Sequence, residues 1–149
     1  MQTEPISAGR WLVYDDPRLL DWCAARIPDC SPEHWHRNGA VPLGVATEND
    51  IIAVMVVHDY EPWYKAAQIS MAATRPDWAR RSTIQKLLNY PFGQLKVDRL
   101  TTLISSENTR ALRFNEGLGF VREGVLKHGC GEHDRIVLGL YRGNAGRWL

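Results

Sequence analysis

Hydrophobic residues along the chain form short runs that alternate between two spacings. Apolar and β-branched runs bounded by turn residues predict strands. These strands lie within residues 10–14, 41–50, 51–61, 64–76, 97–105, 120–129 and 134–142. Apolar residues three or four positions apart predict helices within residues 15–28, from Pro32, within residues 77–95 and within residues 107–119.

The predicted order is one strand, two helices, three strands, a helix, a strand, a helix and two strands. This order indicates an α/β (α+β) fold in which a mixed central sheet of about seven strands carries four helices on both faces. The run within residues 51–61 is apolar on both faces, which is typical of a covered strand. Alternating strands and helices in the middle of the chain predict at least one parallel pair. With 149 residues, the chain is expected to form a single domain, residues 1–149.

Composition narrows the class of protein only slightly. The chain is 44% hydrophobic and 23% charged, with a net charge of +1, so nothing draws it as a whole to nucleic acid or to a membrane. Most of its cations are arginines, which leaves a local basic patch open. Three cysteines without regular spacing argue against a disulfide framework. No apolar run reaches transmembrane length and no signal peptide is expected, so we expect a reducing, cytoplasmic setting.

The late helix carries the most informative boundary residues. Asn108 precedes it, where an amide side chain can cap free N–H groups. Gly119 follows its last apolar residue and can adopt the left-handed conformation that ends a helix. Phe120 starts the next strand and is expected to fill the core behind that turn.

These boundary residues belong to a longer set that, with the order of elements, resembles the GNAT acyltransferase superfamily. The set comprises Asn108, Ala111, Phe114, Leu118, Gly119, Phe120, Glu123 and Gly124. The resemblance covers most of the chain and is best from about Ile69 to Arg142. Residues 78–92 and 139–149 look like a branch frequent in phage and prophage genomes. The resemblance implies an N-acetyltransferase that uses acetyl-CoA as cosubstrate and needs no metal.

The resemblance also implies where acetyl-CoA binds. The candidate cofactor-binding residues are Met71, Ala72, Ala73, Arg80, Arg81, Ser82, Thr83, Ile84 and Asn108. Backbone groups of the strand around Ile69 to Ala73 would pair with pantetheine, and Asn108 would lie along the same arm. Amides at the start of the third predicted helix would bind the pyrophosphate.

The loop before that helix departs from the family pattern. Family members usually carry Arg or Gln followed by glycines, but Ala79, Arg80, Ser82 and Ile84 stand at these positions. Arg80 and Arg81 could neutralise the pyrophosphate while hydroxyls and amides bind it. Alternatively, the loop no longer binds acyl-CoA and the arginines meet another phosphate, such as that of a nucleic acid. A merely solvated arginine pair is disfavoured by the helix dipole.

Proton transfer is the least determined part of the prediction. Many family members use a Tyr on the late helix as general acid, but Asn115 stands at that position and an amide can only hydrogen-bond. His58, Tyr60 and Glu61 are candidate bases, and of these only His58 has an ordinary pKa near neutrality. The candidate acceptor-binding residues are Trp35, His36, Trp63 and Tyr64.

Two clusters of potential metal ligands lack the spacing that indicates zinc. They comprise Cys30, His34 and His36, and His128, Cys130, His133 and Asp134. The acceptor stays open between a protein amine, a small-molecule amine and a nucleobase, so nucleic acid is a candidate partner. A homodimer is a candidate assembly, because dimers are common in the superfamily. The alternative function is a binding module that keeps the fold without catalysis.

Overall fold

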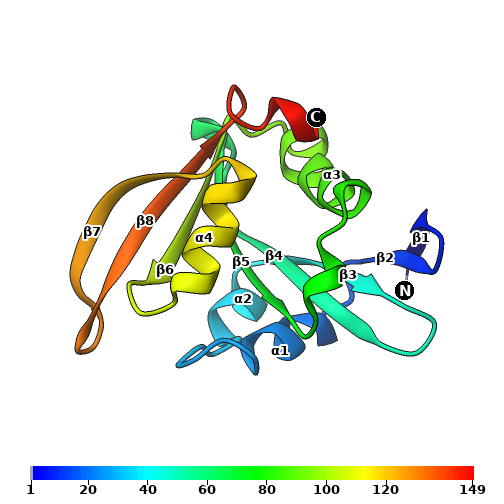
Figure 1. The fold of residues 1–149 in the computed structure, drawn as a ribbon, viewed down its shortest axis with the longest axis horizontal. Helices are drawn as coiled ribbons and strands as arrows, with labels where there is room; N and C mark the ends of the chain where they lie inside the picture. The colour runs from blue at the N-terminus through cyan, green and yellow to red at the C-terminus, as the bar shows by residue number, and fades with distance from the viewer. Residues whose placement is uncertain (1) are drawn as a thin grey trace.

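A computed structural model describes residues 2–149 as one mixed sheet covered by helices (Figure 1). The strands are β1 (Gln2–Ser7), β2 (Arg10–Tyr14), β3 (Val41–Ala46), β4 (Ile51–Glu61), β5 (Ala66–Ala73), β6 (Arg99–Ser105), β7 (Val121–Cys130) and β8 (His133–Tyr141). The helices are α1 (Arg18–Ala24), α2 (Glu33–Arg37), α3 (Arg81–Asn89) and α4 (Thr109–Leu118). None of the helices in this part of the chain has the length and apolar character needed to cross a bilayer.

The eight strands follow the order β1-β2-β3-β4-β5-β6-β8-β7 across the sheet. Every neighbouring pair is antiparallel except β5 and β6, which are parallel and connected through α3. The predicted α/β (α+β) fold, with a parallel pair in the middle of the chain, is therefore confirmed. β8 lies between β6 and β7, so the last two strands form a hairpin that extends the sheet on the left of Figure 1.

The prediction of about seven strands is one short, because β1 was not expected. Its sequence, QTEPIS, has no alternation of apolar and polar residues, and most of its side chains are exposed. Backbone pairing with β2 holds it, with Thr3 opposite Val13 and Pro5 opposite Trp11. Pro5 is tolerated because β1 is an edge strand. An edge strand without an apolar face leaves little trace in a hydrophobicity pattern.

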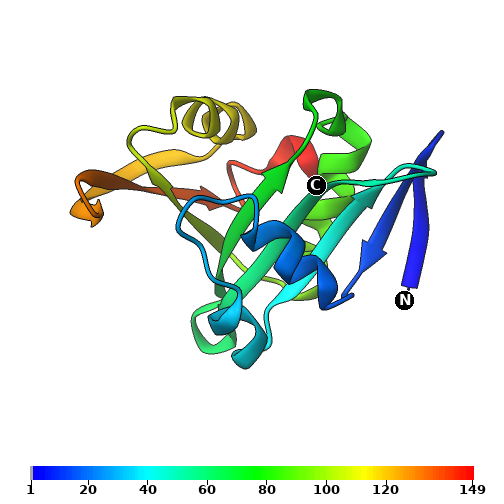
Figure 2. The same cartoon turned by 90° about the horizontal axis from the view of Figure 1, so that it is seen from below.

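The helices cover both faces of the sheet, as predicted. In Figure 1, α1 and α2 lie below the central strands and α3 and α4 above them, and Figure 2 shows α1 in front of the sheet. One core cluster joins α1 and α2 to β4 through Leu20, Trp35 and Val54. A larger cluster joins α3 and α4 to the other side of the sheet, through residues such as Leu87 and Leu112. The two faces of β4 and β5 are therefore packed by different helix pairs.

Helix α4 begins and ends as its sequence predicts. The Asn108 side chain accepts a hydrogen bond from the Ala111 N–H over 3.2 Å, and so caps the first turn. Gly119 ends the helix with φ +115°, and a Cβ there would lie 2.9 Å from the Asn144 carbonyl oxygen. Only glycine fits such a position without strain. Phe120 is buried in the core directly behind this turn.

Candidate active site

The sheet opens between its two parallel strands. Pairing joins only Ala66–Gln68 of β5 to Arg99–Thr101 of β6. One more contact follows, in which the Thr102 hydroxyl donates a hydrogen bond to the Ile69 carbonyl over 3.1 Å. Both strands then run on without further pairing with each other. A V-shaped opening results, and the edge of β5 that faces it has no partner strand within residues 2–149, while the other edge stays paired with β4.

The start of α3 supplies free amides next in sequence to this strand. Arg80 is the N-cap in extended conformation, and the Ile84 N–H donates to its carbonyl over 3.0 Å. The N–H groups of Arg81, Ser82 and Thr83 have no acceptor within the helix, because the first turn of any helix lacks one. Together with the helix dipole they favour an anion at this end. The Ile84 N–H is already used within the helix, and the Ile84 side chain is buried in the core.

The two arginines at this helix start are held by carbonyl groups. Arg80 Nη1 donates to the Ala8 carbonyl over 3.4 Å, and Arg81 Nη2 donates to the Arg147 carbonyl over 3.1 Å. Within residues 2–149 neither guanidinium forms a salt bridge with an acidic side chain. Their charge is therefore not neutralised by the protein and stays available to an anion.

The loop between β5 and α3 is braced on two sides. Arg75 Nε donates to the Asp77 carboxylate over 2.6 Å, and the buried Arg10 of β2 donates to the same carboxylate over 3.0 Å. The Arg75 hydrogen bond holds the pKa of Asp77 at about 2, so this carboxylate is ionised at neutral pH. On the other side Trp78 is buried, with its ring 5.4 Å from the Phe114 ring of α4. These contacts fix the loop in place, next to the sheet on one side and α4 on the other.

Of the four buried side-chain polar atoms that have no hydrogen-bond partner in the described chain, two belong to α3 and α4. They are Thr83 Oγ1, in the first turn of α3, and Asn115 Oδ1, in α4. Asn115 is 7% exposed, and its Nδ2 donates to the Ala111 carbonyl over 2.8 Å. An unpaired buried polar atom costs about 1–3 kcal/mol, which a bound molecule that pairs with it would recover.

On the opposite side of β4 and β5, five polar side chains from the strands and from the α2 region are joined end to end. The Ser70 hydroxyl lies 2.9 Å from His58 Nε2, and His58 Nδ1 lies 2.5 Å from Asp59 Oδ2. The other Asp59 oxygen lies 3.0 Å from His34 Nε2, and Asn38 Nδ2 lies 3.1 Å from His34 Nδ1. Two strands, α2 and the residue after α2 supply these groups, so the complete fold is needed to bring them together.

An irregularity near the end of β4 makes this arrangement possible. Consecutive side chains of a regular strand point to opposite faces. Here the β4–β5 register shifts between His58 and Glu61, and Asp59 has φ +51°. The left-handed residue turns the Asp59 carboxylate back toward the ring of its neighbour. Such a conformation is uncommon for a residue other than glycine and must be held by its surroundings.

Burial and hydrogen bonds set the charges of this group. The His58 side chain is 10% exposed, and its ring lies 5.7 Å from the ring of the buried Trp35. Burial lowers the pKa of His58, and the hydrogen bond with Asp59 offsets only part of this. Burial also works against ionisation of Asp59, but hydrogen bonds from His58 and His34 hold its pKa below the ordinary value. At neutral pH a neutral His58 therefore lies beside an ionised Asp59.

The other candidate bases and one acceptor residue lie apart from this group. Tyr60 is exposed and its hydroxyl donates to the Leu95 carbonyl over 3.2 Å. Glu61 is exposed at the end of β4. His36 Nε2 lies 3.1 Å from Asp21 Oδ1 of α1, so α2 directs this histidine away from His58. Trp35 is the predicted acceptor-side residue that the structure places against His58.

Two predicted acceptor-side aromatics form an exposed rim beyond β4. Trp63 and Tyr64 lie in a short 3-10 turn, 70% and 72% exposed, with ring centroids 6.1 Å apart. Their exposure leaves both rings free to contact a molecule that enters from this end of the strand. The structure brings them near the end of β4 without packing them into the core.

Side chains of the two clusters of potential metal ligands form hydrogen bonds with other groups of the protein. Among residues 2–149 no group of three or more His, Cys, Asp and Glu side chains is arranged to hold a metal ion. In the first cluster His34 and His36 bond separate carboxylates. In the second, Asp134 accepts a hydrogen bond from the His128 N–H over 3.1 Å and so closes the hairpin turn.

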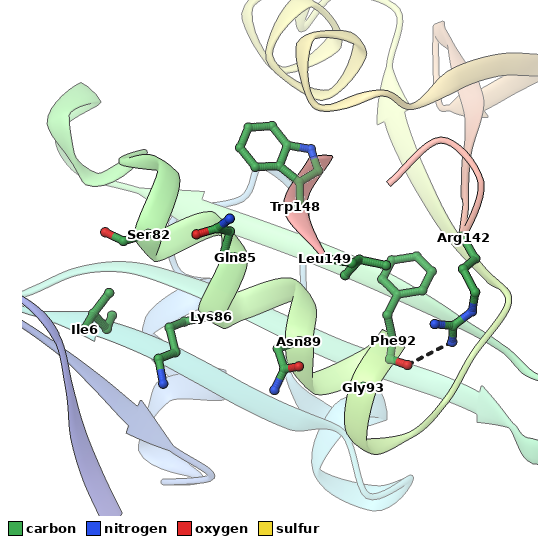
Figure 3. Close-up of a pocket in the computed structure, with 10 residues that line it drawn as sticks. All are labelled: Ile6, Ser82, Gln85, Lys86, Asn89, Phe92, Gly93, Arg142, Trp148 and Leu149. Atoms are coloured by element: carbon green, nitrogen blue, oxygen red, sulfur yellow. Dashed lines mark hydrogen bonds between the residues drawn. The ribbon is translucent and has the colours of Figure 1, made fainter. Parts of the chain in front are cut away.

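A separate groove of about 390 Å³ lies on the outer side of α3 (Figure 3). It is lined by Ile6, Ser82, Gln85, Lys86, Asn89, Phe92, Gly93, Arg142, Trp148 and Leu149. Its two cations are engaged: Lys86 lies 3.4 Å from the Glu4 carboxylate, and Arg142 Nη2 donates to the Phe92 and Val97 carbonyls. We assign no ligand to this groove.

Four polar residues linked to His58, directly or through Asp59, were not predicted from the sequence as catalytic residues. Asp59 follows His58 directly, but strand alternation places neighbours on opposite faces, so adjacency alone gave no reason to pair them. Ser70 becomes a partner only once the β4–β5 register is known. His34 stood out only as a potential metal ligand, and Asn38 gave no signal.

Comparison with known proteins identifies the fold. No protein-family model matches the chain, and no curated protein matches it. Among solved structures, the N152L mutant of spermidine N-acetyltransferase SpeG from Vibrio cholerae is 17% identical, covers 96% of this chain and 98% of its own, and superposes with a TM-score of 0.73. A dodecameric structure of spermidine N-acetyltransferase from Vibrio cholerae is 17% identical, covers 92% of this chain and 96% of its own, and has a TM-score of 0.70.

A third structure, described as a "probable acetyltransferase", is 16% identical, covers 96% of this chain and 98% of its own, and has a TM-score of 0.71. At such identities the likeness shows the fold alone. The likeness confirms the mixed α/β (α+β) fold expected from the GNAT resemblance.

Proposed function

We propose that this chain is an acyl-CoA-dependent N-acyltransferase, which moves an acyl group, acetyl from acetyl-CoA, directly to an amine. The observation that carries the proposal is the opening between β5 and β6. Unpaired backbone amides and carbonyls in the middle of a sheet are costly unless something pairs with them. Pantetheine is an extended chain with two amide groups, and it matches the free edge of β5 around Met71, Ala72 and Ala73.

The second part of the proposal concerns the phosphates. An extended molecule that lies along β5 leads to the start of α3, because the strand and the helix are joined by the braced loop around Trp78. Three free amides, from Arg81, Ser82 and Thr83, meet an anion there. The charges of Arg80 and Arg81 lie beside them without acidic partners among the described residues. Side chains thus stand where the family uses glycines.

The reaction follows from these positions. The amine nitrogen attacks the thioester carbonyl carbon, the carbon–sulfur bond breaks, and the CoA thiolate leaves and takes a proton. Positioning of the two reactants and polarisation of the carbonyl by backbone amides supply most of the rate. Asn115 Oδ1 has no partner in the described chain and can accept a hydrogen bond, but the amide cannot serve as the acid. The thiolate therefore takes its proton from the amine or from solvent.

The acceptor is an amine of open class: a small-molecule amine, a protein amine or, given the phage-like segments 78–92 and 139–149, a nucleobase amine. The structurally similar proteins named spermidine N-acetyltransferase make small polyamines the first compounds to test. The exposed aromatic rim of Trp63 and Tyr64 suits a cationic amine, because aromatic faces attract cations. A homodimer and a cytoplasmic location stay predictions.

Calorimetric titration of the purified chain with acetyl-CoA tests the proposal first. We expect heat of binding and a raised melting temperature at millimolar acetyl-CoA. CoA release, measured as free thiol, is then followed with polyamines, lysine peptides and single-stranded DNA. Absence of both heat and thermal stabilisation would refute the acyltransferase. Binding of acetyl-CoA without thiol release from any acceptor would favour the binding module.

A further inference from the structure

We propose that Ser70, His58 and Asp59 work as one unit that takes the proton from the acceptor amine. His34 and Asn38 are positioning residues that fix the orientation of this unit. The inference rests on the proposed function and names the base that the reaction needs. It separates His58 from the other two candidate bases, Tyr60 and Glu61.

The direction of each hydrogen bond from Asn38 to Ser70 can be derived by starting at Asn38. Asn38 Nδ2 donates to the His34 backbone carbonyl over 2.8 Å, and a carbonyl can only accept, which fixes the amide orientation. The same Nδ2 faces His34 Nδ1 over 3.1 Å, so this ring nitrogen is the acceptor. A neutral His34 then carries its proton on Nε2 and donates it to Asp59 Oδ1.

The rest of the chain follows from the ionised carboxylate. Asp59 can only accept, so the His58 nitrogen that faces it, Nδ1, must carry a proton. The other ring nitrogen, Nε2, then has a free lone pair, because burial keeps His58 neutral. Ser70 donates its hydroxyl proton to that lone pair over 2.9 Å. A hydroxyl, an imidazole and a carboxylate linked in this order are the arrangement of a Ser-His-Asp triad.

The unit lies at the start of the opening in the sheet. Ser70 directly follows Ile69, whose carbonyl accepts the last hydrogen bond from β6. It is opposite Val56 in the β4–β5 register, and Val56 packs with α1 and α2. The hydroxyl therefore faces the α1 and α2 side of the sheet, while Ile69 faces the α3 and α4 side. An amine that approaches from the α1 and α2 side meets Ser70 where the strands separate.

The proton balance fits this position. The ammonium passes one proton to Ser70 Oγ while the Ser70 proton moves to His58 Nε2. The product is a free amine beside an imidazolium whose charge is balanced by the Asp59 carboxylate. After attack on the thioester the nitrogen loses a second proton, which the CoA thiolate takes, and His58 later returns its proton to solvent. A purely structural role would be met more simply by apolar side chains, such as the neighbouring Val54 and Val56.

The first experiment reads the histidine tautomers by nitrogen NMR of the full chain. The wild type should show neutral His58 with its proton on Nδ1. In Asp59→Asn, His34 still donates to the amide oxygen, so the amide NH₂ faces His58 Nδ1 and the proton of His58 should move to Nε2. Asp21→Asn is the matched control, since it alters the separate pair with His36. An unchanged His58 tautomer in Asp59→Asn would overturn the unit.

The second experiment measures transfer to an amine that the wild type accepts. Asp59→Asn should lower kcat by about 10²–10⁴-fold without changing the Kd of acetyl-CoA. Ser70→Ala should lower kcat by about 10–10²-fold, and Ser70→Thr, which keeps the hydroxyl, should recover most of it. Full activity in Asp59→Asn or in His58→Gln would refute the base. A wild type that binds no acetyl-CoA would instead refute the proposed function, and the base with it, while the NMR result still decides whether the unit exists.

Discussion

The polar side chains on the two sides of β5 differ in their hydrogen bonding. On the α1 and α2 face, Ser70 belongs to a continuous chain of hydrogen bonds that ends at Asn38. On the α3 and α4 face, Thr83 Oγ1 and Asn115 Oδ1 are buried without partners in the described chain. The α1 and α2 face is organised before any reactant arrives. The other face keeps free polar groups, both at side chains and along the β5 edge, and so is suited to a ligand rich in hydrogen-bonding groups.

The two sides of the sheet are also made rigid by different interactions. The α3 and α4 side, where we propose that acetyl-CoA binds, is stiffened by apolar packing, of which Trp78 against Phe114 is the clearest contact. The α1 and α2 side, from which we propose that the acceptor approaches, is stiffened by hydrogen bonds that also fix the tautomer of His58. Substitutions of packed residues on the first side should therefore affect mainly stability, and substitutions of hydrogen-bonded residues on the second side should affect mainly catalysis. Four predictions test this contrast.

The largest effect is expected from Trp78→Ala. Removal of this buried ring leaves a cavity against Phe114 and should lower the free energy of unfolding by about 3–5 kcal/mol. Trp63→Ala is the matched control, because that ring is 70% exposed, and it should change stability by less than about 0.5 kcal/mol. Urea denaturation measures both. Equal losses for the two variants would contradict the role of Trp78 as a packed wall.

Protonation of His58 should give the next largest effect. Because burial lowers the pKa of His58, the neutral base persists down to pH values below its ordinary pKa of about 6.5. Below the lowered pKa, kcat should fall about tenfold per pH unit. The same group contributes stability that is present above about pH 6.5 and lost as the pH falls through the lowered pKa.

A histidine NMR titration provides the comparison for this pH profile. The His58 pKa it reports should match the acid limb of kcat. Asp59→Asn should lower that pKa further, because the carboxylate favours the imidazolium. A His58 pKa above its ordinary value in the wild type would mean that Asp59 outweighs burial, contrary to our expectation.

Local sequence patterns predicted the fold well, whereas the contacts of the Ser70, His58 and Asp59 unit depend on the register between β4 and β5. Apolar spacing and turn residues located each of the helices and all strands except β1. The caps of α4 at Asn108 and Gly119 could be assigned because they act within a few residues of themselves. The contact between Ser70 and His58 spans twelve positions and exists only in one register of β4 against β5. A left-handed Asp59 within a strand has no signature in sequence.

The arginines at the start of α3 are expected to matter for affinity, not for stability. Arg80→Ala combined with Arg81→Ala should weaken acetyl-CoA binding by about tenfold, since two charges beside the amides of α3 are lost. Arg26→Ala, just after α1, is the control, because that exposed side chain lies over Trp22 on the other face of the sheet. Isothermal titration at two salt concentrations measures the difference. Unchanged affinity of the double variant would refute a phosphate role for the pair.

The smallest effect, and the sharpest contrast, should come from two buried threonines. Thr83→Val removes a hydroxyl without a partner in the described chain and should stabilise the free protein by about 1 kcal/mol. Thr102→Val removes a hydroxyl that donates to the Ile69 carbonyl and should destabilise it by about the same amount.

Acetyl-CoA should then separate the two roles of Thr83. If its hydroxyl pairs with the bound phosphates, Thr83→Val loses affinity for acetyl-CoA while the apo protein gains stability. Melting temperatures of Thr83→Val and Thr102→Val, each measured with and without acetyl-CoA, report both the stability of the apo protein and its affinity for acetyl-CoA. A destabilised apo Thr83→Val protein would show that the hydroxyl is already paired in the free chain, and the contrast between the two faces of the sheet would then disappear at this position.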